Sequence, residues 1–425
     1  MNHGPLSKKA GRYSVAEGMV DKVHDVVVVG AGPGGSATAH YLAKGGLDVL
    51  LLDRAVFPRE KTCGDGLTPR ALGVLEDMGI LDRIRDFAFQ VNGIEMYGTK
   101  GDEMVTSIPQ NDHYPNHLLI TPRYQLDEII FQKALESGAQ FQGNSRVRGV
   151  EHYPNHAEIY AGRNGKGVRV AGRIVVLAVG SNLALLDKMG FLNRSPGLIL
   201  AVRGYFKGLH GLTDRVQVHF GHVPLPGYAW VFPLSETRAN VGIGFWKERM
   251  PWERSPASAK IAFDRFLAHN PKMKVMMADA HLEGQVKGFP LRVDFARSKT
   301  CKGRVLLVGE SAGLVSPFTG EGIDFALESG RLAANFLLRR FERGEVSPSS
   351  LEGYDALLRA RFQRLFVFLT RIRKLYLNPF IMDRAIMATN QFPELKQLLA
   401  KILISQEDAA SLVTLSVMRK VLLGV

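Results

Sequence analysis

Three glycines near the start of the chain have the spacing of a turn that binds phosphate. Gly30, Gly32 and Gly35 follow the apolar run 26–29, and Asp53 closes a second apolar run further on. Such a turn brings backbone N–H groups and a helix N-terminus to a pyrophosphate, and an acid about twenty residues later accepts hydrogen bonds from a ribose. The pattern predicts strand, glycine turn, helix, strand and acid, and with them a bound dinucleotide.

A second glycine-rich stretch lies far along the chain. Residues 304–308 read as a buried strand, Glu310 follows it, and the segment 317–323 contains Gly320 and Gly322. An acid after a strand can hold the hydroxyls of a flexible polyol, and a glycine turn that opens a helix can approach a polarised ring edge. Glu321 and Asp324 are expected to serve the first turn of that helix through its dipole. The two stretches predict that both ends of the chain meet around one ligand.

The elements that must position these residues follow from the apolar pattern. Helices are expected over 68–90 and 121–137, and a buried parallel strand is expected over 174–179. The chain reads as helical after 347. Four short β-rich runs predict an antiparallel sheet: 198–206, 216–220, 228–232 and 239–245. We therefore expect an α/β fold with a Rossmann-type nucleotide-binding domain, an inserted β-sheet and a helical C-terminus.

Composition and cysteine count narrow the class of protein. The chain has 425 residues, of which 46% are hydrophobic and 22% charged, as in globular proteins. Cys63 and Cys301 are the only cysteines, which excludes an iron–sulfur cluster held by four thiolates, and we expect no metal site. The first 22 residues lack the apolar core of a signal peptide, and no apolar run reaches the ~20 residues that span a bilayer. A cytoplasmic protein is expected.

Positive charge is concentrated toward the C-terminus. The net charge is +13, and residues 331–425 hold 15 Lys and Arg against 8 Asp and Glu. The segment 361–377 mixes bulky apolar residues with cations. Two interpretations stay open: a helix that packs its apolar face on the body, or one that lies on an anionic membrane and makes the protein peripheral on the inner membrane face. Nucleic acid is not expected as a partner.

Two further motifs carry a family resemblance. One is Lys61-Thr-Cys-Gly-Asp-Gly-Leu67, and the other is Pro226-Gly-Tyr-Ala-Trp-Val-Phe-Pro233, followed by Asn240-Val-Gly-Ile-Gly244. With the glycine turns, they resemble the geranylgeranyl reductase family of FAD-dependent oxidoreductases, which have the para-hydroxybenzoate hydroxylase fold. The resemblance covers roughly residues 23–345, and the sequence as a whole is most similar to the bacterial menaquinone side-chain reductases.

The resemblance implies the cofactor, FAD, and a role for each matching residue. Gly30, Gly32, Gly34 and Gly35 would line the pyrophosphate, and Asp53 would hold the adenosine ribose. The flavin would lie beside Cys63, Gly64, Gly66, Gly322 and Ile323, and Glu310 would hold the ribityl chain. The remaining residues expected to contact the cofactor are Arg54, Arg123, Val147, Gly309 and Gly320.

A substrate site is implied beside the flavin. Tyr228, Trp230 and Phe232 would line an apolar slot for a polyprenyl chain, although their alternation also fits a plain aromatic core. Cys63 would be a catalytic candidate or a small buried hydrophobe. Reducing equivalents would come from NAD(P)H or a ferredoxin-like donor.

Two departures from the family pattern concern the cofactor. Glu310 stands where family members usually have Asp, and the extra methylene moves the carboxylate by about one bond, so its contacts need readjustment or a water. Val179 stands where the related hydroxylases have the Asp of an Asp-Gly pair. That change weakens the expectation of an aromatic hydroxylase and of direct NADPH docking.

The expected domains follow these motifs. The FAD-binding domain is discontinuous, and the β-sheet insertion is the substrate domain. In order, we expect a flexible polar tail at 1–22, the FAD-binding domain at 23–95, 115–190 and 288–345, the substrate domain at 96–114 and 195–287, and a helical region at 346–425.

The activity implied by the resemblance is reduction of isolated double bonds in a polyprenyl lipid. Hydride from reduced flavin would reach one alkene carbon while an acid protonates the other. A flavin monooxygenase or halogenase acting on a small aromatic is one alternative, but the halogenase Trp-x-Trp-x-Ile-Pro has Tyr228 and Phe232 in place of its first Trp and its Ile. An electron-transfer flavoprotein that reduces quinone is another, and a flavin-binding interaction protein is the non-enzymatic one.

Overall fold

The computed structural model describes residues 22–110, 114–163, 165–192, 196–246, 259–376, 379–406 and 413–423. The expected polar tail at 1–22 lies outside the described residues except for Lys22. Within the described part of the chain, no helix is both long and apolar enough to cross a bilayer.

The first sheet is built on the buried apolar runs that the sequence marks as strands. Five strands of this sheet, from β18 through β11, β1 and β2 to β8, pair in parallel with their neighbours. At the centre of the sheet, Val26, Val27 and Val28 are fully buried. Such runs form strands covered on both faces. The order is β17 (Cys301–Lys302), β18 (Val305–Leu307), β11 (Lys166–Leu177), β1 (Val23–Val29), β2 (Val49–Leu52) and β8 (Gln140–Gln142). The expected strands near 174–179 and 304–308 are β11 and β18.

Three helices pack beside this sheet: α1 (Pro33–Lys44), α4 (Arg123–Glu136) and α8 (Ile323–Glu342). The expected helix at 121–137 is α4. Helices α1 and α8 lie unusually close because glycines face each other between them. A Cβ on Gly330 would come within 2.6 Å of the Gly34 carbonyl oxygen, so only glycine fits there.

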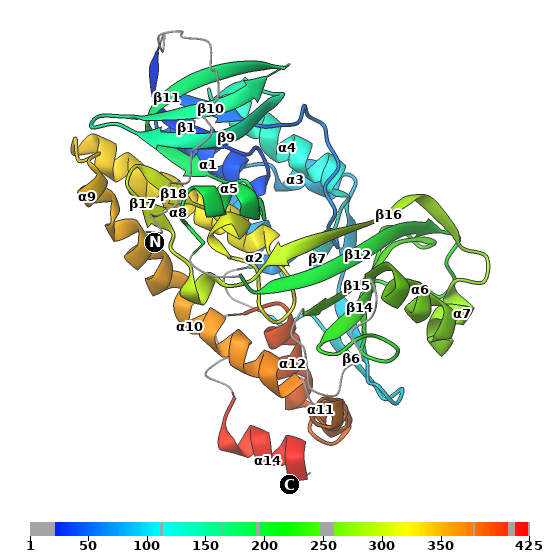
Figure 1. The fold of residues 1–425 in the computed structure, drawn as a ribbon. Coiled ribbons are helices and arrows are strands. Elements are labelled where there is room, and N and C mark those ends of the chain that lie inside the picture. The colour runs from blue at the N-terminus through cyan, green and yellow to red at the C-terminus, as the bar shows by residue number, and fades with distance from the viewer. Residues whose placement is uncertain are drawn as a thin grey trace, which may run out of the picture.

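A β-meander extends the first sheet and was not expected from the sequence. Strands β9 (Ser145–His152) and β10 (Ala157–Arg163) pair antiparallel with each other, and β10 pairs with the first half of β11. Figure 1 shows the meander at the upper end of the molecule. Strand β11 therefore begins well before the expected residue 174, because its residues 166–170 pair with β10 and not with β1.

The helix expected over 68–90 is wrong in its length. The structure has α2 (Pro69–Asp77) and α3 (Leu81–Arg85), and strand β4 (Phe89–Val91) follows. Gly79 breaks the helix because its φ is +71°, a left-handed conformation that glycine adopts without strain. Strand β4 joins a small sheet with β7 (Leu118–Ile120) and β3 (Gly66–Leu67).

The second sheet contains the four expected β-rich runs. Its pairs are antiparallel except β5 with β13, which is parallel. Strand β5 extends across the domain border expected after residue 95, and β16 extends across the one expected after residue 287. The order is β16 (His281–Arg292), β12 (Leu198–Lys207), β15 (Arg238–Trp246), β14 (Gly227–Pro233), β13 (Arg215–His219), β5 (Gly93–Tyr97) and β6 (Glu103–Ser107).

One face of the second sheet is covered by helices α6 (Ala259–His269) and α7 (Pro271–Met276). Ala229 and Val231 of β14 pack there against Phe263 and Phe266. Because side chains alternate along a strand, residues 228, 230 and 232 face the other side of the sheet.

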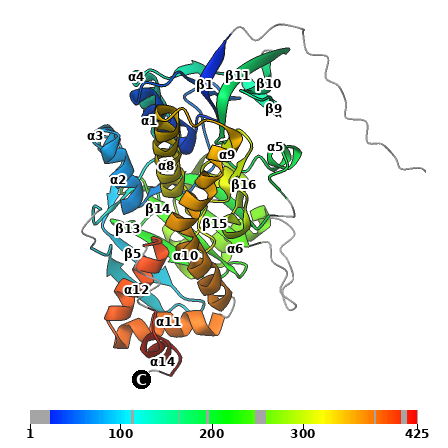
Figure 2. The same ribbon diagram turned by 90° about the vertical axis from the view of Figure 1, so that its left-hand side faces the viewer.

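The C-terminal helices run along the body to its far end, as Figure 1 and Figure 2 show. They are α9 (Pro348–Leu351), α10 (Gly353–Tyr376), α11 (Pro379–Gln391), α12 (Glu394–Leu403) and α14 (Leu415–Leu423), and a short α5 (Leu183–Lys188) follows β11. Phe362, Phe366 and Leu369 of α10 are buried in the main core. These three apolar side chains of the basic segment 361–377 therefore pack on the body of the protein.

The close approach of Gly35 to the first glycine turn gives a stability prediction. A Cβ on Gly35 would overlap the carbonyl oxygen of Gly30, and backbone cannot move aside as a side chain can. We expect Gly35→Ala to lower the free energy of unfolding by at least the roughly 1–3 kcal/mol typical of overpacking. The control is Gly149→Ala, whose Cβ would meet the movable Lys188 side chain at 3.3 Å. Urea unfolding measures both, and equal stability of the two variants would contradict the packing argument.

Candidate functional site

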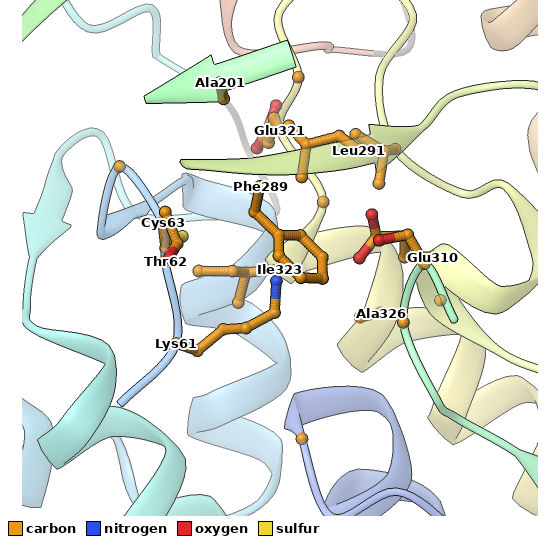
Figure 3. A pocket seen from close by; sticks show the side chains of 18 of the residues that line it. Lys61, Thr62, Cys63, Ala201, Phe289, Leu291, Glu310, Glu321, Ile323 and Ala326 are labelled. Carbon is orange, nitrogen blue, oxygen red and sulfur yellow. The ribbon is translucent and has the colours of Figure 1, made fainter. Parts of the chain in front are cut away.

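A cavity of about 810 Å³ is lined by residues of both large sheets, the loops between them and the start of α8. Figure 3 shows part of it, with Lys61, Cys63, Phe289, Glu310 and Ile323 around one open space. These residues come from segments far apart in the sequence. The two ends of the chain therefore meet at one site.

One end of the cavity is the glycine turn. Gly30 has a φ of +103°, which favours glycine, and no side chain among the described residues caps the N-terminus of α1. The carboxylate of Asp53 joins this turn to the next loop, because it accepts hydrogen bonds from the N–H groups of Ala31 and Ala55, both at 2.8 Å. The α1 N-terminus thus keeps donors for an anion at the cavity.

The middle of the cavity carries charged groups held in fixed positions. Arg123 donates two hydrogen bonds to the Asp127 carboxylate, at 2.6 and 2.8 Å, and Arg59 pairs with the same carboxylate at 3.1 Å. The Glu310 carboxylate accepts the backbone N–H of Arg292 at 3.1 Å. This contact orients the Glu310 side chain at the cavity wall, where Figure 3 shows it.

The loop that contains Cys63 is tied to the second sheet by one amide. The Asn240 side chain donates to the carbonyl oxygen of Cys63 and to the carboxylate of Asp65, both at 2.8 Å, and accepts the Trp230 indole N–H at 2.9 Å. The Tyr205 hydroxyl also donates to Asp65, at 2.6 Å. Burial raises the pKa of Asp65 from its ordinary 3.8 to about 6, against these two hydrogen bonds, which lower it.

The aromatic side chains of β14 form part of the cavity wall. Tyr228, Trp230 and Phe232 all line it, with neighbouring ring centroids 6.0 and 6.2 Å apart. The Tyr228 hydroxyl donates to the carbonyl oxygen of Thr319, in the loop before α8. These residues belong to the wall of a cavity and not to a closed core.

An apolar arm of the cavity continues beyond the aromatic residues. Tyr228 and Phe232 pack against an apolar cluster of β5, β7, β13 and the C-terminal helices, and members of that cluster line the cavity. We call these residues the apolar arm: Ile94, Leu118, Val216, Val218, Phe220 and Ile404. Because they come from distant segments, no local sequence pattern could have indicated them.

The site residues named from the sequence lie at this cavity with one exception. Gly35 packs against the backbone of Gly30 and does not line the cavity, so its role is structural. The residues that line it are Gly30, Gly32, Gly34, Asp53, Arg54, Cys63, Gly64, Gly66, Arg123, Val147, Tyr228, Trp230, Phe232, Gly309, Glu310, Gly320, Gly322 and Ile323. Sequence reasoning gave no site role to Glu321, which also lines it.

Comparison with known proteins agrees with this geometry. Residues 23–202 match the FAD binding domain, and residues 210–283 match the geranylgeranyl reductase catalytic domain. A menaquinone reductase of Mycobacterium tuberculosis is 34% identical over 332 residues, which cover 75% of this chain and 77% of that protein. A digeranylgeranylglycerophospholipid reductase of Thermoplasma acidophilum is 29% identical over 353 residues, 81% of this chain and 85% of that protein.

The chain belongs to the geranylgeranyl reductase family.

The predicted fold class is confirmed as well. The crystal structure of a geranylgeranyl bacteriochlorophyll reductase-like protein from Thermoplasma acidophilum superposes with a TM-score of 0.74, covering 94% of this chain and 96% of that one at 24% identity. As a member of the geranylgeranyl reductase family, the protein is an FAD-dependent oxidoreductase. The cavity fits that cofactor, because its volume lies in the range of ligand pockets. It is lined by the uncapped N-terminus of α1, by the Glu310 carboxylate, and by Gly320 and Gly322 just before α8.

The raised pKa of Asp65 predicts a pH-dependent stability. Between the unfolded pKa of 3.8 and the folded pKa of about 6, the carboxyl is charged in the unfolded chain and neutral in the folded protein, so stability falls as the pH rises through this window. Asp65 alone should therefore remove about 3 kcal/mol of stability between those pH values. We expect Asp65→Asn to flatten the dependence of the unfolding free energy on pH in this window.

Urea unfolding at a series of pH values measures this effect. Asp86→Asn, which changes an exposed aspartate after α3, is the matched control and should leave the dependence as in wild type. An unchanged slope in Asp65→Asn would mean that Asp65 is not the group responsible.

Proposed function

We propose that the protein reduces isolated double bonds in the polyprenyl chain of a lipid, with the side chain of a menaquinone as the leading candidate. The observation that carries the proposal is the apolar arm, because its residues line the same cavity as Tyr228 and Phe232 and pack in one apolar cluster with them. An apolar cavity wall of this kind suits a long hydrocarbon chain. The names of the reductases described above support the same substrate class.

Bound FAD supplies the hydride chemistry of this reaction. Each reduced double bond gains one hydride at one carbon and one proton at the other. The work of the protein is to hold the alkene in line, to exclude water and to provide the proton. Tyr228, Trp230 and Phe232 are placed to do the first two, since their rings form the wall where the apolar arm begins.

Site roles extend this proposal to the cofactor. The α1 N-terminus and its glycines would hold the pyrophosphate, Asp53 the ribose, and Glu310 the ribityl chain. The longer side chain of Glu310 is already anchored by the Arg292 N–H, which compensates for its extra methylene. Cys63 lies on the tied loop beside the flavin side of the cavity, where its carbonyl is held by Asn240. The electron donor is proposed to be NAD(P)H or a ferredoxin-like protein.

Replacing a small side chain in the apolar arm with a larger one tests the substrate class. We expect Val218→Phe to slow the reduction of long polyprenyl quinones at least tenfold and to spare a short prenyl analogue, because the added ring narrows the arm away from the flavin. The assay reduces the flavin with dithionite without oxygen, adds the lipid, and follows the return of the oxidised absorbance. Mass spectrometry then counts two added hydrogens per reduced bond.

The control for this experiment is Val105→Phe on the exposed side of β6. It should behave as wild type, and FAD content should be the same in all three proteins. Reoxidation of the flavin without added hydrogens on the lipid would instead favour an electron-transfer flavoprotein. Reoxidation only by oxygen with a small aromatic would favour a monooxygenase.

We further propose that the C-terminal helices dock on an anionic membrane. Exposed apolar side chains gather on the neighbouring helices α11 and α14: Phe380, Met387, Leu415 and Met418. Arg384 of α11 lies over the Phe380 ring, so cation and apolar surface are presented together. Ile404, directly after α12, lines the cavity, and Figure 2 shows α11, α12 and α14 together at one end of the molecule.

Liposome co-sedimentation checks this surface. The double variant Leu415→Ser, Met418→Ser should bind vesicles rich in anionic lipid several-fold more weakly than wild type, because less apolar area enters the interface. Binding should also fall with added salt. The control is Val275→Ser, which removes an exposed apolar residue from α7. Equal binding of the double variant and wild type would remove the surface from the proposal.

A further inference from the structure

Glu321 is an acidic side chain at the wall of the cavity that the cofactor contacts leave unused. It lies between Gly320 and Gly322, directly before α8, and lines the cavity. Figure 3 shows it among the side chains that line the cavity. The Tyr228 hydroxyl donates to the carbonyl oxygen of Thr319, two residues before Glu321, so Glu321 lies on the loop that contacts the aromatic wall where the apolar arm begins.

The surroundings of Glu321 keep its carboxyl neutral. Both of its oxygens are buried, and neither makes a well-formed hydrogen bond within the described residues. The groups facing it are the Asp324 carboxyl of α8, the Thr68 hydroxyl, the Arg70 guanidinium of α2 and the Tyr228 hydroxyl. Burial raises the pKa of Glu321 well above its usual range, and the neighbouring Asp324 raises it further, while Thr68 and Arg70 lower it less.

A purely structural role for Glu321 does not fit these contacts. An acid that stabilised α8 through its dipole would be ionised and bonded to the first backbone N–H groups. Asp324 fills that place, because its carboxylate accepts the Phe325 N–H at 2.7 Å and lies 3.7 Å from Arg70. Arg70 also pairs with Glu328 at 3.4 Å. The charge of Arg70 is thus met by the acids of α8, while burial and the neighbouring Asp324 favour the neutral form of Glu321.

Two hydroxyl groups near this wall, those of Tyr228 and Thr68, are less suited to give up a proton. The Tyr228 hydroxyl is engaged with the Thr319 carbonyl, and burial raises the pKa of Tyr228 far above its usual range. The Thr68 hydroxyl caps α2 by accepting the Ala71 N–H. An isolated alkene is a poor base, so its protonation needs an acid whose strength is not reduced by contact with water. A neutral carboxyl whose oxygens are both buried has that property.

We propose that Glu321 is the proton donor of the reaction, an inference that rests on the proposed function. The O–H bond of Glu321 breaks as its proton forms a C–H bond at one alkene carbon, and the other alkene carbon accepts a hydride from the reduced flavin. The lipid gains two electrons and two hydrogens, the flavin is oxidised, and Glu321 is left as a carboxylate. It regains a proton from solvent when the product leaves and water enters the cavity.

The test compares wild type with Glu321→Gln, which keeps the size of the side chain and removes the acidic proton. The flavin is reduced with dithionite without oxygen, a polyprenyl quinone is added, and a single turnover is followed by absorbance. We expect the rate constant to fall 10²- to 10⁴-fold, the range typical of lost general acid catalysis. In wild type the rate constant should decline as the pH rises through the raised pKa of Glu321, and this decline should be missing in Glu321→Gln.

Two measurements separate proton donation from a structural role. FAD affinity and reduction potential should stay within a few-fold and a few millivolts of wild type in Glu321→Gln, as in the control Glu76→Gln on the exposed side of α2. Infrared spectra of the oxidised holoenzyme in D₂O should show the carbonyl band of a neutral carboxyl, and this band should be lost in Glu321→Gln. Glu321→Asp, which keeps an acid, should recover part of the rate and the pH profile.

The outcomes also distinguish this inference from the proposed function. If wild type is not reoxidised by any polyprenyl lipid, the proposed function fails. If wild type turns over and Glu321→Gln has the same rate and pH profile, Glu321 is not the donor. If Glu321→Gln does not fold, the infrared band and Glu321→Asp decide: a wild-type spectrum without the band, or an aspartate variant with an unchanged pH profile, overturns the inference.

Discussion

The position of the aromatic wall relative to the loop of Cys63 and Asp65 depends on one side-chain amide. Asn240 bonds to Trp230 within the second sheet and to Cys63 and Asp65 in the loop that leads to α2. Its donor and acceptor are both used, so the amide can be satisfied in one orientation only. A buried amide that is bonded on both sides fixes geometry better than apolar contact, which tolerates sliding. The two halves of the site are therefore held in register by polar contacts, and the apolar arm needs no such precision.

Much of the cofactor end of the site could be predicted from the sequence because its determinants are local. The Gly30 turn, the Asp53 acid and the alternation of Tyr228, Trp230 and Phe232 each depend on a few consecutive residues and a known period. Helix α4 and the strands of the second sheet were found for the same reason. These features depend on backbone conformation and on the alternation of strand faces, which neighbouring residues determine.

The features that the sequence did not indicate depend on contacts between distant segments. The apolar arm combines β5, β13 and the end of α12, and nothing in any one of them marks a channel. The basic segment 361–377 left both a core helix and a membrane-bound helix open until α10 was seen to bury Phe362 and Phe366. Glu321 resembled an ordinary first-turn acid, because its neutrality arises from burial in the folded protein and from the neighbouring Asp324. A pKa shift of this kind cannot be read from residue types alone.

The contact between α1 and α8 has a consequence for how the protein is made. Gly34 of α1 and Gly330 of α8 lie in contact, although nearly the whole sequence of the nucleotide-binding part separates them. While the chain is being synthesised, the glycine turn emerges early but its partners, β18 and α8, emerge only after the entire second sheet. Contacts so distant in sequence form late in folding. FAD can therefore be captured in full only near the end of translation, and until then the apolar strands of the first sheet remain exposed to chaperones and to other nascent chains.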